Sequence, residues 1–420
     1  MSDIMKQADT LYKVGKFSQA ESKYLALLKK NNDNIEVLTR LGNIALLKNR
    51  PEQSIDLYMQ ARNETGWLSG KWPFSAQLDY RIGSAFYRMD NFRQAAHWYA
   101  KATGPLPVGP FKELSALHKH SAAMGDDTAY EISGPGEFAI NFIATDPLPF
   151  VEVMINDQGP FSFFIDTGGA EIILATSLAK RMNIETVAEI ASKGFAGGKK
   201  GKVGFGRFDK LQLGEIAVKN LPAHILDLAE ISQGLKRPTH GVIGTRLLMQ
   251  FYSTIDYVNS RLILRRINER NRGELNKLAN QSKTIPFWLA DSHYMLVTGR
   301  LNDLESSLFF VDTGLAGKGF NTSGTMLEKA GVEIDWSKAS RGVGGGGEVE
   351  VVDVNIKRVS IGEGDNEVIK HDLSGTANRE VPAILSGEFG FKVTGIISHS
   401  FFRDATLTFD FEKMQLLIEE

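Results

Sequence analysis

Cysteine is absent from the 420-residue sequence. This absence excludes disulfide bonds, cysteine nucleophiles and metal sites that use thiolate ligands. Because disulfides are common in secreted proteins and rare in reducing compartments, a chain without cysteine fits a reducing compartment.

The sequence also has little net charge and no long apolar run. Lys and Arg number 48 and Asp and Glu number 50, which gives a formal charge of -2 at pH 7. This balance provides no broad attraction to nucleic acid or to an anionic membrane surface, so neither is expected as a partner. Residues 1–7 lack the apolar core of a secretory signal, and no window approaches the roughly 20 apolar residues of a membrane span. We therefore expect a soluble, cytoplasmic protein.

The remaining composition is typical of a globular protein, with 42% hydrophobic and 23% charged residues. A chain of 420 residues is too long for one ordinary core, so two to three domains are expected.

The first hundred residues contain an internal repeat, with small and aromatic residues at fixed positions. The first two copies lie 34 residues apart (42 minus 8), and the third follows after 41 (83 minus 42). The matching residues are Ala8, Ala20, Tyr24 and Leu27, then Gly42, Ser54, Tyr58 and Ala61, then Gly83, Ala95, Tyr99 and Ala102. This period resembles the tetratricopeptide repeat, in which each helix pair covers the apolar face of its neighbour. With a terminal cap at 111–124, we predict a helical repeat domain over residues 1–125.

Two interpretations of this domain stay open. In one, its concave face is a platform for a peptide or a protein partner. In the other, the stacked helices form a spacer that positions the rest of the chain.

A six-residue pattern occurs twice in the remaining chain. It reads Phe-Phe-Ile-Asp-Thr-Gly at 163–168 and Phe-Phe-Val-Asp-Thr-Gly at 309–314. A carboxylate directly after an apolar strand is costly to bury unless it is hydrogen-bonded, paired or functional. Two such residues on two similar halves, Asp166 and Asp312, suggest a paired acid–base site.

The duplication extends well beyond this pattern. In each half a short helix, a glycine cluster, an apolar pair after glycine and two strands around an aspartate follow in the same order. These features lie at 177–182, 194–198, 241–244 and 251–264 in the first half and at 325–330, 342–347, 395–398 and 402–418 in the second. A polar connection at 265–282 separates the halves. One duplicated lobe explains this order, so we predict lobes over residues 127–272 and 273–420.

This ordered set resembles the retropepsin-like aspartic peptidases, with two lobes in tandem as in pepsins. The resemblance covers about residues 127–420. It implies a multidomain chain in which all-α, tetratricopeptide-type repeats precede a mainly-β, bilobal acid-protease fold. It also implies a catalytic pair, Asp166 and Asp312, that acts on a peptide or protein substrate without a metal or cofactor. Because both lobes belong to one chain, dimerisation is not required to build the site.

The chemistry of such a pair follows from its charge. Two carboxylates roughly 3 Å apart share one proton, because both cannot ionise comfortably. The ionised member removes a proton from a water, and the protonated member donates toward the substrate carbonyl oxygen. Which aspartate is the base stays open, because the pair titrates as a unit.

The resemblance assigns supporting roles to further residues. The hydroxyls of Thr167 and Thr313 would cross-link the two loops beneath the carboxylates, and Gly168 and Gly314 would let backbone amides approach the acidic oxygens. The glycine clusters are candidates for flaps over the substrate, with ordinary hairpin turns as the alternative. The flap candidates are Phe195, Ala196, Gly197, Gly198, Val343, Gly344 and Gly345. The closing motif behind the dyad comprises Ile243, Gly244, Ile397 and Ser398.

Three positions depart from the family pattern. Gly169 and Leu315 stand where pepsins have a serine or threonine that donates to the carboxylate, and Ser398 stands where glycine is usual. Fewer donors to the charged form leave a carboxylate pKa less depressed. We therefore expect an activity optimum nearer neutrality than that of gastric-type enzymes.

The sequence thus predicts an aspartic endopeptidase whose helical arm recruits a substrate or a protein partner. One alternative is a non-catalytic peptide-binding protein in which Ser398 and the altered post-glycine positions leave the dyad mis-set. Another is a scaffold in which the repeats carry the function.

Overall fold

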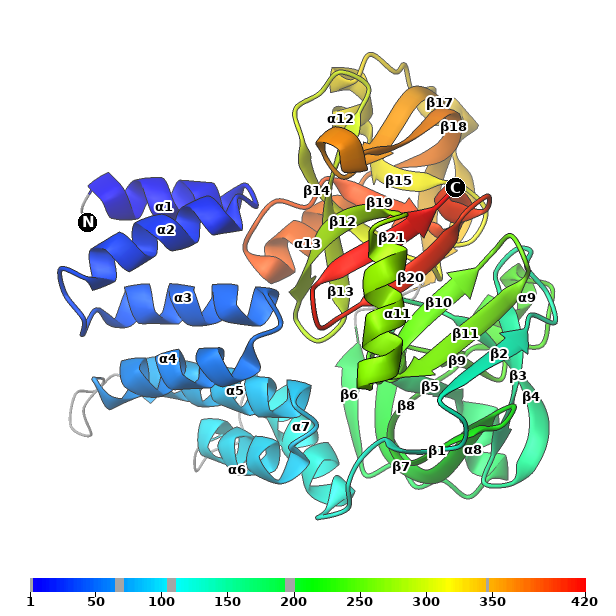
Figure 1. Ribbon diagram of the computed structural model, residues 1–420, viewed down its shortest axis with the longest axis horizontal. Coiled ribbons are helices and arrows are strands. Elements are labelled where there is room, and N and C mark those ends of the chain that lie inside the picture. The colour runs from blue at the N-terminus through cyan, green and yellow to red at the C-terminus, as the bar shows by residue number, and fades with distance from the viewer. Residues whose placement is uncertain (1–2, 65–71, 104–110, 193–200, 345–346) are drawn as a thin grey trace.

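The computed structural model describes residues 3–64, 72–103, 111–192, 201–344 and 347–420. A stack of helices lies on one side of the molecule and a β-rich region lies on the other (Figure 1). Within the described ranges, none of the helices combines the length and the apolar character needed to cross a membrane.

The described part of the N-terminal region consists of seven helices, each packed against the next. They are α1 (Asp3–Lys13), α2 (Phe17–Leu28), α3 (Ile35–Leu47), α4 (Pro51–Asn63), α5 (Trp72–Arg88), α6 (Phe92–Thr103) and α7 (Phe111–Met124). The prediction of helical repeats followed by a mainly-β region is confirmed, and α7 covers the residues predicted as a terminal cap.

Small residues of the repeat lie where two helices cross closely. A Cβ on Gly42 would overlap the ring of Tyr58, and a Cβ on Gly83 would lie 2.8 Å from the ring of Tyr99. The Ser54 hydroxyl donates to the Gly42 carbonyl oxygen at 2.8 Å. The repeated small residues therefore lie at helix contacts that leave no room for a larger side chain.

Two sets of strands in the β-rich region share one pairing pattern. The first set is β1 (Glu131–Ser133), β3 (Phe150–Ile155), β4 (Gln158–Ile165), β5 (Ile172–Ala175), β6 (Ala188–Ser192), β7 (Gly201–Leu213), β8 (Ile216–Leu226) and β9 (Gly241–Ile243). The second set is β13 (Tyr294–Leu301), β14 (Ser307–Asp312), β15 (Phe320–Ser323), β16 (Ser340–Gly344), β17 (Gly347–Ile361), β18 (Val368–Asn378) and β19 (Gly395–Ser398). Strand β4 pairs with β9 in parallel, as β14 does with β19, and β5 pairs with β8 in parallel, as β15 does with β18.

A central group of strands lies between the two sets and draws on both halves of the chain. These strands are β2 (Glu137–Asn141), β10 (Phe251–Asp256), β11 (Arg261–Arg266), β12 (Lys283–Ala290), β20 (Thr406–Asp410) and β21 (Gln415–Glu419). Their order is β12-β21-β20-β10-β11-β2, and β12 also pairs with β13, so they continue the sheet of the second set. At the β10–β20 contact, Thr254 and Thr408 pair in register and their hydroxyls lie 2.7 Å apart. The two halves are therefore joined by a continuous sheet.

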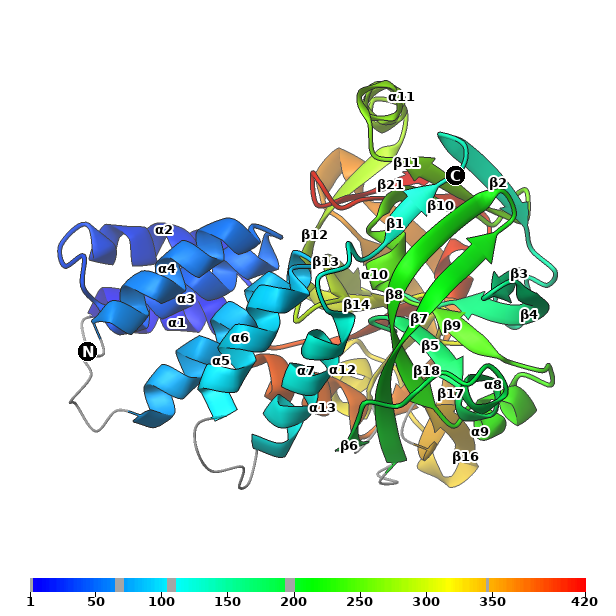
Figure 2. The same ribbon diagram turned by 90° about the horizontal axis from the view of Figure 1, so that it is seen from below.

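Short helices follow the strands at the predicted places. Helices α8 (Thr176–Arg181) and α12 (Gly324–Lys329) follow the two Asp-Thr-Gly segments, and α11 (Glu269–Ala279) forms the polar connection. The remaining helices are α9 (Ala229–Gly234), α10 (Thr245–Leu248), α13 (Val381–Phe389) and three 3-10 turns at Trp336–Lys338, Gly364–Asn366 and His399–Phe402. Figure 2 shows α11 on one side of the molecule and the labelled strands β6 and β16 on the opposite side.

The helical stack packs extensively against the β-rich region. Residues of α1–α3 share one apolar cluster with strands β12–β14 and with α13. Within it, the ring of Phe17 lies 4.9 Å from that of Phe391 and 5.1 Å from that of Trp288, centroid to centroid. The backbone amide of Lys392 donates to the carbonyl oxygen of Lys13 at 2.8 Å. The helical stack therefore shares a core with the β-rich region.

Candidate active site

The two Asp-Thr-Gly segments meet between the two strand sets. Asp166 directly follows β4, and its amide donates to the carbonyl oxygen of Ile243 at 3.0 Å. Asp312 ends β14 and pairs in register with Ser398. The two parallel pairings carry both aspartates to one place, where their carboxyl groups are hydrogen-bonded to each other.

Backbone amides of the glycines point at these carboxylates. The Gly168 amide donates to Asp166 Oδ1 at 2.6 Å, and the Gly314 amide donates to Asp312 Oδ1 at 2.9 Å. A Cβ on Gly168 would lie 2.9 Å from Asp312 Oδ1, and one on Gly314 would overlap the carboxyl group of Asp166. Each glycine therefore makes room for the aspartate of the opposite segment.

Threonine hydroxyls cross-link the two segments beneath the carboxylates. Thr167 Oγ1 donates to the carbonyl oxygen of Val311 at 2.7 Å and accepts from the Thr313 amide at 3.0 Å. Thr313 Oγ1 donates to the carbonyl oxygen of Ile165 at 3.2 Å and accepts from the Thr167 amide at 3.0 Å. Both side chains are fully buried. This reciprocal arrangement holds the two loops in a fixed relation.

The electrostatics of the pair favour a shared proton. Burial raises the pKa of Asp166, against the effect of hydrogen bonds from Asp312 and from the amides of Gly168, Gly169 and Gly314. Burial, followed by the negative charge of Asp166, raises the pKa of Asp312 well above its usual value. One carboxyl group of the pair therefore keeps its proton at a pH where an isolated aspartate is ionised.

The two closing motifs differ in whether a side chain fits at the position after the apolar pair, which is Gly244 in the first half and Ser398 in the second. A Cβ on Gly244 would lie 2.6 Å from the carbonyl oxygen of Ala170 and would overlap that of Glu171, so only glycine fits there. In the second half the Ser398 hydroxyl donates to the carbonyl oxygen of Lys318. The departure from glycine is accommodated by a hydrogen bond, and Ile243 and Ile397 are both fully buried beside these positions.

The second glycine cluster begins on strand β16, which pairs with β17 in an antiparallel hairpin, and β6 pairs with β7 in the same way in the first half. Val343 pairs in register with Glu348, and Gly344 pairs with Gly347. The other flap candidates, Phe195, Ala196, Gly197, Gly198 and Gly345, lie outside the described residues.

Several residues around the first segment were not predicted from the sequence. Glu171 and Arg246 are buried beside it, within 3.6 Å of each other, and Tyr87 of the helical stack donates to Glu171 at 2.8 Å. His293 is also buried and hydrogen-bonds the backbone of Gly168; burial lowers its pKa to about 3. Local sequence carried no signal for these contacts, because each joins segments far apart in the chain.

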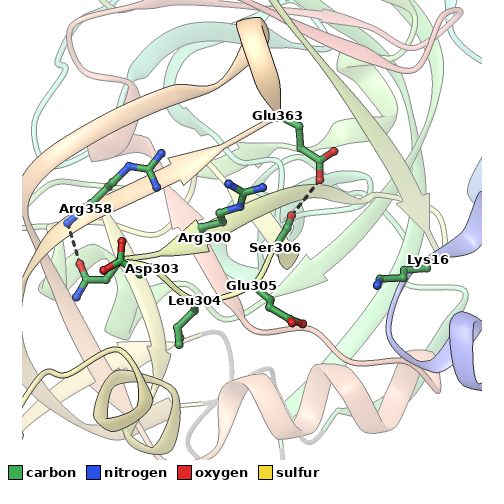
Figure 3. Close-up of a pocket in the computed structure, with 9 residues that line it drawn as sticks. Lys16, Arg300, Asp303, Leu304, Glu305, Ser306, Arg358 and Glu363 are labelled. Atoms are coloured by element: carbon green, nitrogen blue, oxygen red, sulfur yellow. Dashed lines mark hydrogen bonds between the residues drawn. The ribbon is translucent and has the colours of Figure 1, made fainter.

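One pocket among the described residues lies away from the dyad. It measures about 590 Å³ and lies where the α1–α2 turn faces the second strand set. Figure 3 shows Arg300 near its centre and a hydrogen bond from Ser306 to Glu363. Three cations (Lys16, Arg300, Arg358) and three carboxylates (Asp303, Glu305, Glu363) line it, so its charges balance. No cluster of three metal-ligating side chains occurs within the described ranges.

Comparison with known proteins agrees with the site at the level of a family. Residues 151–247, which include the first Asp-Thr-Gly segment, match a family model described as aspartyl protease. Comparison with curated proteins gave no match.

Three solved structures are similar to parts of the chain. The N-terminal domain of stress-induced protein-1 from C. elegans is 15% identical to this chain, with a TM-score of 0.25. The match covers 28% of this chain and 100% of that domain. A type III secretion translocator chaperone of Yersinia enterocolitica is 14% identical, covers 28% of this chain and 81% of its own, with a TM-score of 0.25. A retropepsin-like aspartic protease from Rickettsia conorii is 20% identical, covers 33% of this chain and 94% of its own, with a TM-score of 0.22.

Proposed function

We propose that the protein is an aspartic endopeptidase whose single active site lies between Asp166 and Asp312. The observation that carries the proposal is the hydrogen-bonded carboxyl pair, cross-linked from below by two threonine hydroxyls. Its first half also lies within the segment that matches the aspartyl protease family model.

The mechanism needs one water and one proton on the carboxyl pair. The ionised carboxylate takes a proton from the water as the oxygen attacks the peptide carbonyl carbon, and the protonated carboxyl donates to the carbonyl oxygen. The resulting tetrahedral intermediate collapses with protonation of the leaving amine, which breaks the C–N bond. Burial raises the pKa of both carboxyl groups, so the pair holds one proton and either aspartate can serve as the base.

We further propose that the two strand sets are lobes of one peptidase fused in tandem. Their matching strand pairings support this origin. Each lobe supplies one aspartate, so a second copy of the chain is not needed. The β6–β7 and β16–β17 strand pairs are the proposed flaps, because in the sequence each glycine cluster falls where one strand of the pair is followed by the other.

Recruitment of a protein by the helical stack is a separate proposal. Arg81 of α5 donates to Asn43 of α3 at 2.7 Å, and Arg40 of α3 lies 3.3 Å from Asp9 of α1. We refer to these partly exposed polar side chains of α1, α3 and α5 as the polar row, and we propose that they bind a polar peptide segment. On the intact chain, Arg81→Ala should raise the KM for a protein substrate and leave cleavage of a short peptide unchanged. An unchanged KM for protein substrates would count against recruitment by this row.

Substitution of each aspartate tests the catalytic proposal. Asp166→Asn and Asp312→Asn should each lower the cleavage rate of a diverse peptide pool by about 10²–10⁴-fold, because each removes one partner of the acid–base pair. A suitable control is Asp157→Asn, which changes an exposed aspartate paired with Lys210 on the β3–β4 turn and should leave the rate unchanged.

A non-catalytic peptide-binding protein is the rival function, and one titration separates the two. A statine-type inhibitor should bind the wild-type chain and lose affinity in Asp312→Asn. Tight binding of peptides without cleavage at any pH from 3 to 8 would favour the binding function instead.

A further inference from the structure

A buried carboxylate lies close behind the first catalytic loop. Glu171 is fully buried, and its two oxygens accept hydrogen bonds from Tyr87 of the helical stack, at 2.8 Å, and from Tyr130 of the connecting segment. Arg246 Nε lies 3.6 Å from the same carboxylate. Tyr87 belongs to the helical stack, so the environment of Glu171 depends on how the helical stack is docked.

Arg246 extends this network into the turn between α5 and α6. Its guanidinium is 1% exposed and donates to the carbonyl oxygens of Arg88 and Tyr87, both at 2.9 Å. It also forms an ion pair with Asp90, whose other oxygen accepts from the Gln250 side chain at 3.0 Å. A buried arginine needs such partners, because an unpaired charge in this environment is strongly unfavourable.

The backbone beside Arg246 continues directly to the catalytic loop. The Arg246 amide donates to the carbonyl oxygen of Ala170 at 2.9 Å, and the Thr245 amide donates to that of Gly169 at 2.9 Å. Thr245 Oγ1 donates to the carbonyl oxygen of Thr167 at 3.0 Å. Three successive contacts therefore tie the arginine to the loop that carries Asp166.

We propose that the α5–α6 turn of the helical stack positions the first catalytic loop, through Tyr87 and Asp90 acting on Glu171 and Arg246. These four are positioning residues, since none of them touches the reacting atoms. The inference rests on the proposed peptidase function for its effect on rate, but its structural effect on the loop is independent of that function. The helical stack is then part of the active-site framework in addition to any role in recruitment.

In the part of the chain that the structure describes, the second catalytic loop lacks such a charged network. The residues that correspond to Glu171 and Arg246 are Gly317 and Ser400, so neither charge is present. There the closing motif is held by the neutral hydrogen bond from Ser398 to Lys318. The charged network therefore acts on the Asp166 side of the pair, whereas the second loop meets the helical stack through the apolar cluster that includes β14 and Leu315.

Two mild substitutions in the intact chain test the proposal. Tyr87→Phe removes the hydroxyl that donates to Glu171 and keeps the ring that packs on Phe92, and Asp90→Asn removes the charge that faces Arg246. Each should lower kcat for a short peptide by about fivefold with little change in KM, the effect of one lost hydrogen bond on the reactive geometry. Amide hydrogen exchange of residues 166–171 should become faster by a similar factor in both variants.

The matched control is Tyr58→Phe, which removes a hydroxyl that donates to Asn43 within the helical stack at 2.7 Å. It should change neither kcat nor exchange of 166–171. Exchange of 166–171 that stays at the wild-type rate in both variants overturns the proposal, as does exchange that accelerates equally throughout the chain. Failure of the wild type to cleave any peptide would overturn the peptidase function, while the exchange measurement would still decide the coupling.

Discussion

At the scale of single residues, Gly169 has no side chain that could reach the Asp166–Asp312 carboxyl pair. A Cβ on Gly169 would lie 3.7 Å from Asp166 Oδ2 and 3.5 Å from Ile173 Cδ1, which are ordinary contact distances. The Asp166 carboxylate accepts hydrogen bonds from backbone amides, and burial raises its pKa overall. A hydroxyl at this position would add a donor to the charged form.

We expect Gly169→Ser to lower the pKa of Asp166, because a donated hydrogen bond stabilises the ionised carboxylate. The proposed peptidase activity requires one ionised member of the pair, so the acid limb of the profile of kcat/KM against pH should move to lower pH. Gly169→Ala adds the same Cβ without the hydroxyl and should leave that limb in place. An acid limb that moves equally in both variants would assign the shift to the added carbon.

Only some residues of this site could be predicted from the sequence. Asp166, Thr167 and Gly168 were predicted together because their contacts with the second segment are repeated in the two copies of one motif. Glu171 and Arg246 were not predicted, since a buried ion pair between positions 75 residues apart (246 minus 171) leaves no local pattern. The flap candidates stay predictions; they are Phe195, Ala196, Gly197, Gly198, Val343, Gly344 and Gly345.

At the scale of elements, the helices show which small residues are required by packing. Gly42 lies in α3 where a Cβ would overlap Tyr58, whereas Gly273 lies in α11 with nothing within 4 Å of the Cβ position. The two glycines therefore have opposite consequences for stability, although both are inside helices.

We expect Gly42→Ala to lower the free energy of unfolding by about 1–3 kcal/mol, since the added methyl forces α3 away from α4. Gly273→Ala should raise it by about 0.5–1 kcal/mol, because alanine loses less backbone entropy in a helix. Urea unfolding followed by circular dichroism measures both. Equal effects of the two substitutions would contradict the packing role of Gly42.

At the scale of the whole molecule, the helical stack docks on both halves of the β-rich region. Helices α1–α3 share an apolar cluster with the second half, and α7 packs on β6, β7 and β8 of the first. His120 of α7 is buried in this contact and hydrogen-bonds the carbonyl oxygen of Gly206 at 3.1 Å. Burial, with a smaller effect of His224, lowers the pKa of His120 to about 3.

This shift makes the docking contact sensitive to acid. Below about pH 6.5 the unfolded chain protonates His120 and the folded chain does not, so the free energy of unfolding falls by about 1.4 kcal/mol per pH unit until about pH 3. Above pH 6.5 this group contributes no slope.

We therefore expect the stability difference between the wild type and His120→Gln to narrow as the pH falls from 7 to 4. Glutamine does not titrate, so the variant loses this part of the acid dependence. Denaturant unfolding at several pH values measures the difference. A difference that stays constant from pH 7 to pH 4 would contradict the burial of a neutral His120.

The sequence by itself determined the repeat of the helices and the two Asp-Thr-Gly segments, and it predicted two similar β-rich halves. These follow from local patterns: helical period, strand alternation and turn glycines act within a few residues and recur in each copy. Only the tertiary structure decided that the helical stack docks on both halves and that Tyr87 and Asp90 reach Glu171 and Arg246. Those contacts join buried polar groups from distant segments, and their free energy depends on a solvent-excluded environment that exists only after the whole chain has folded.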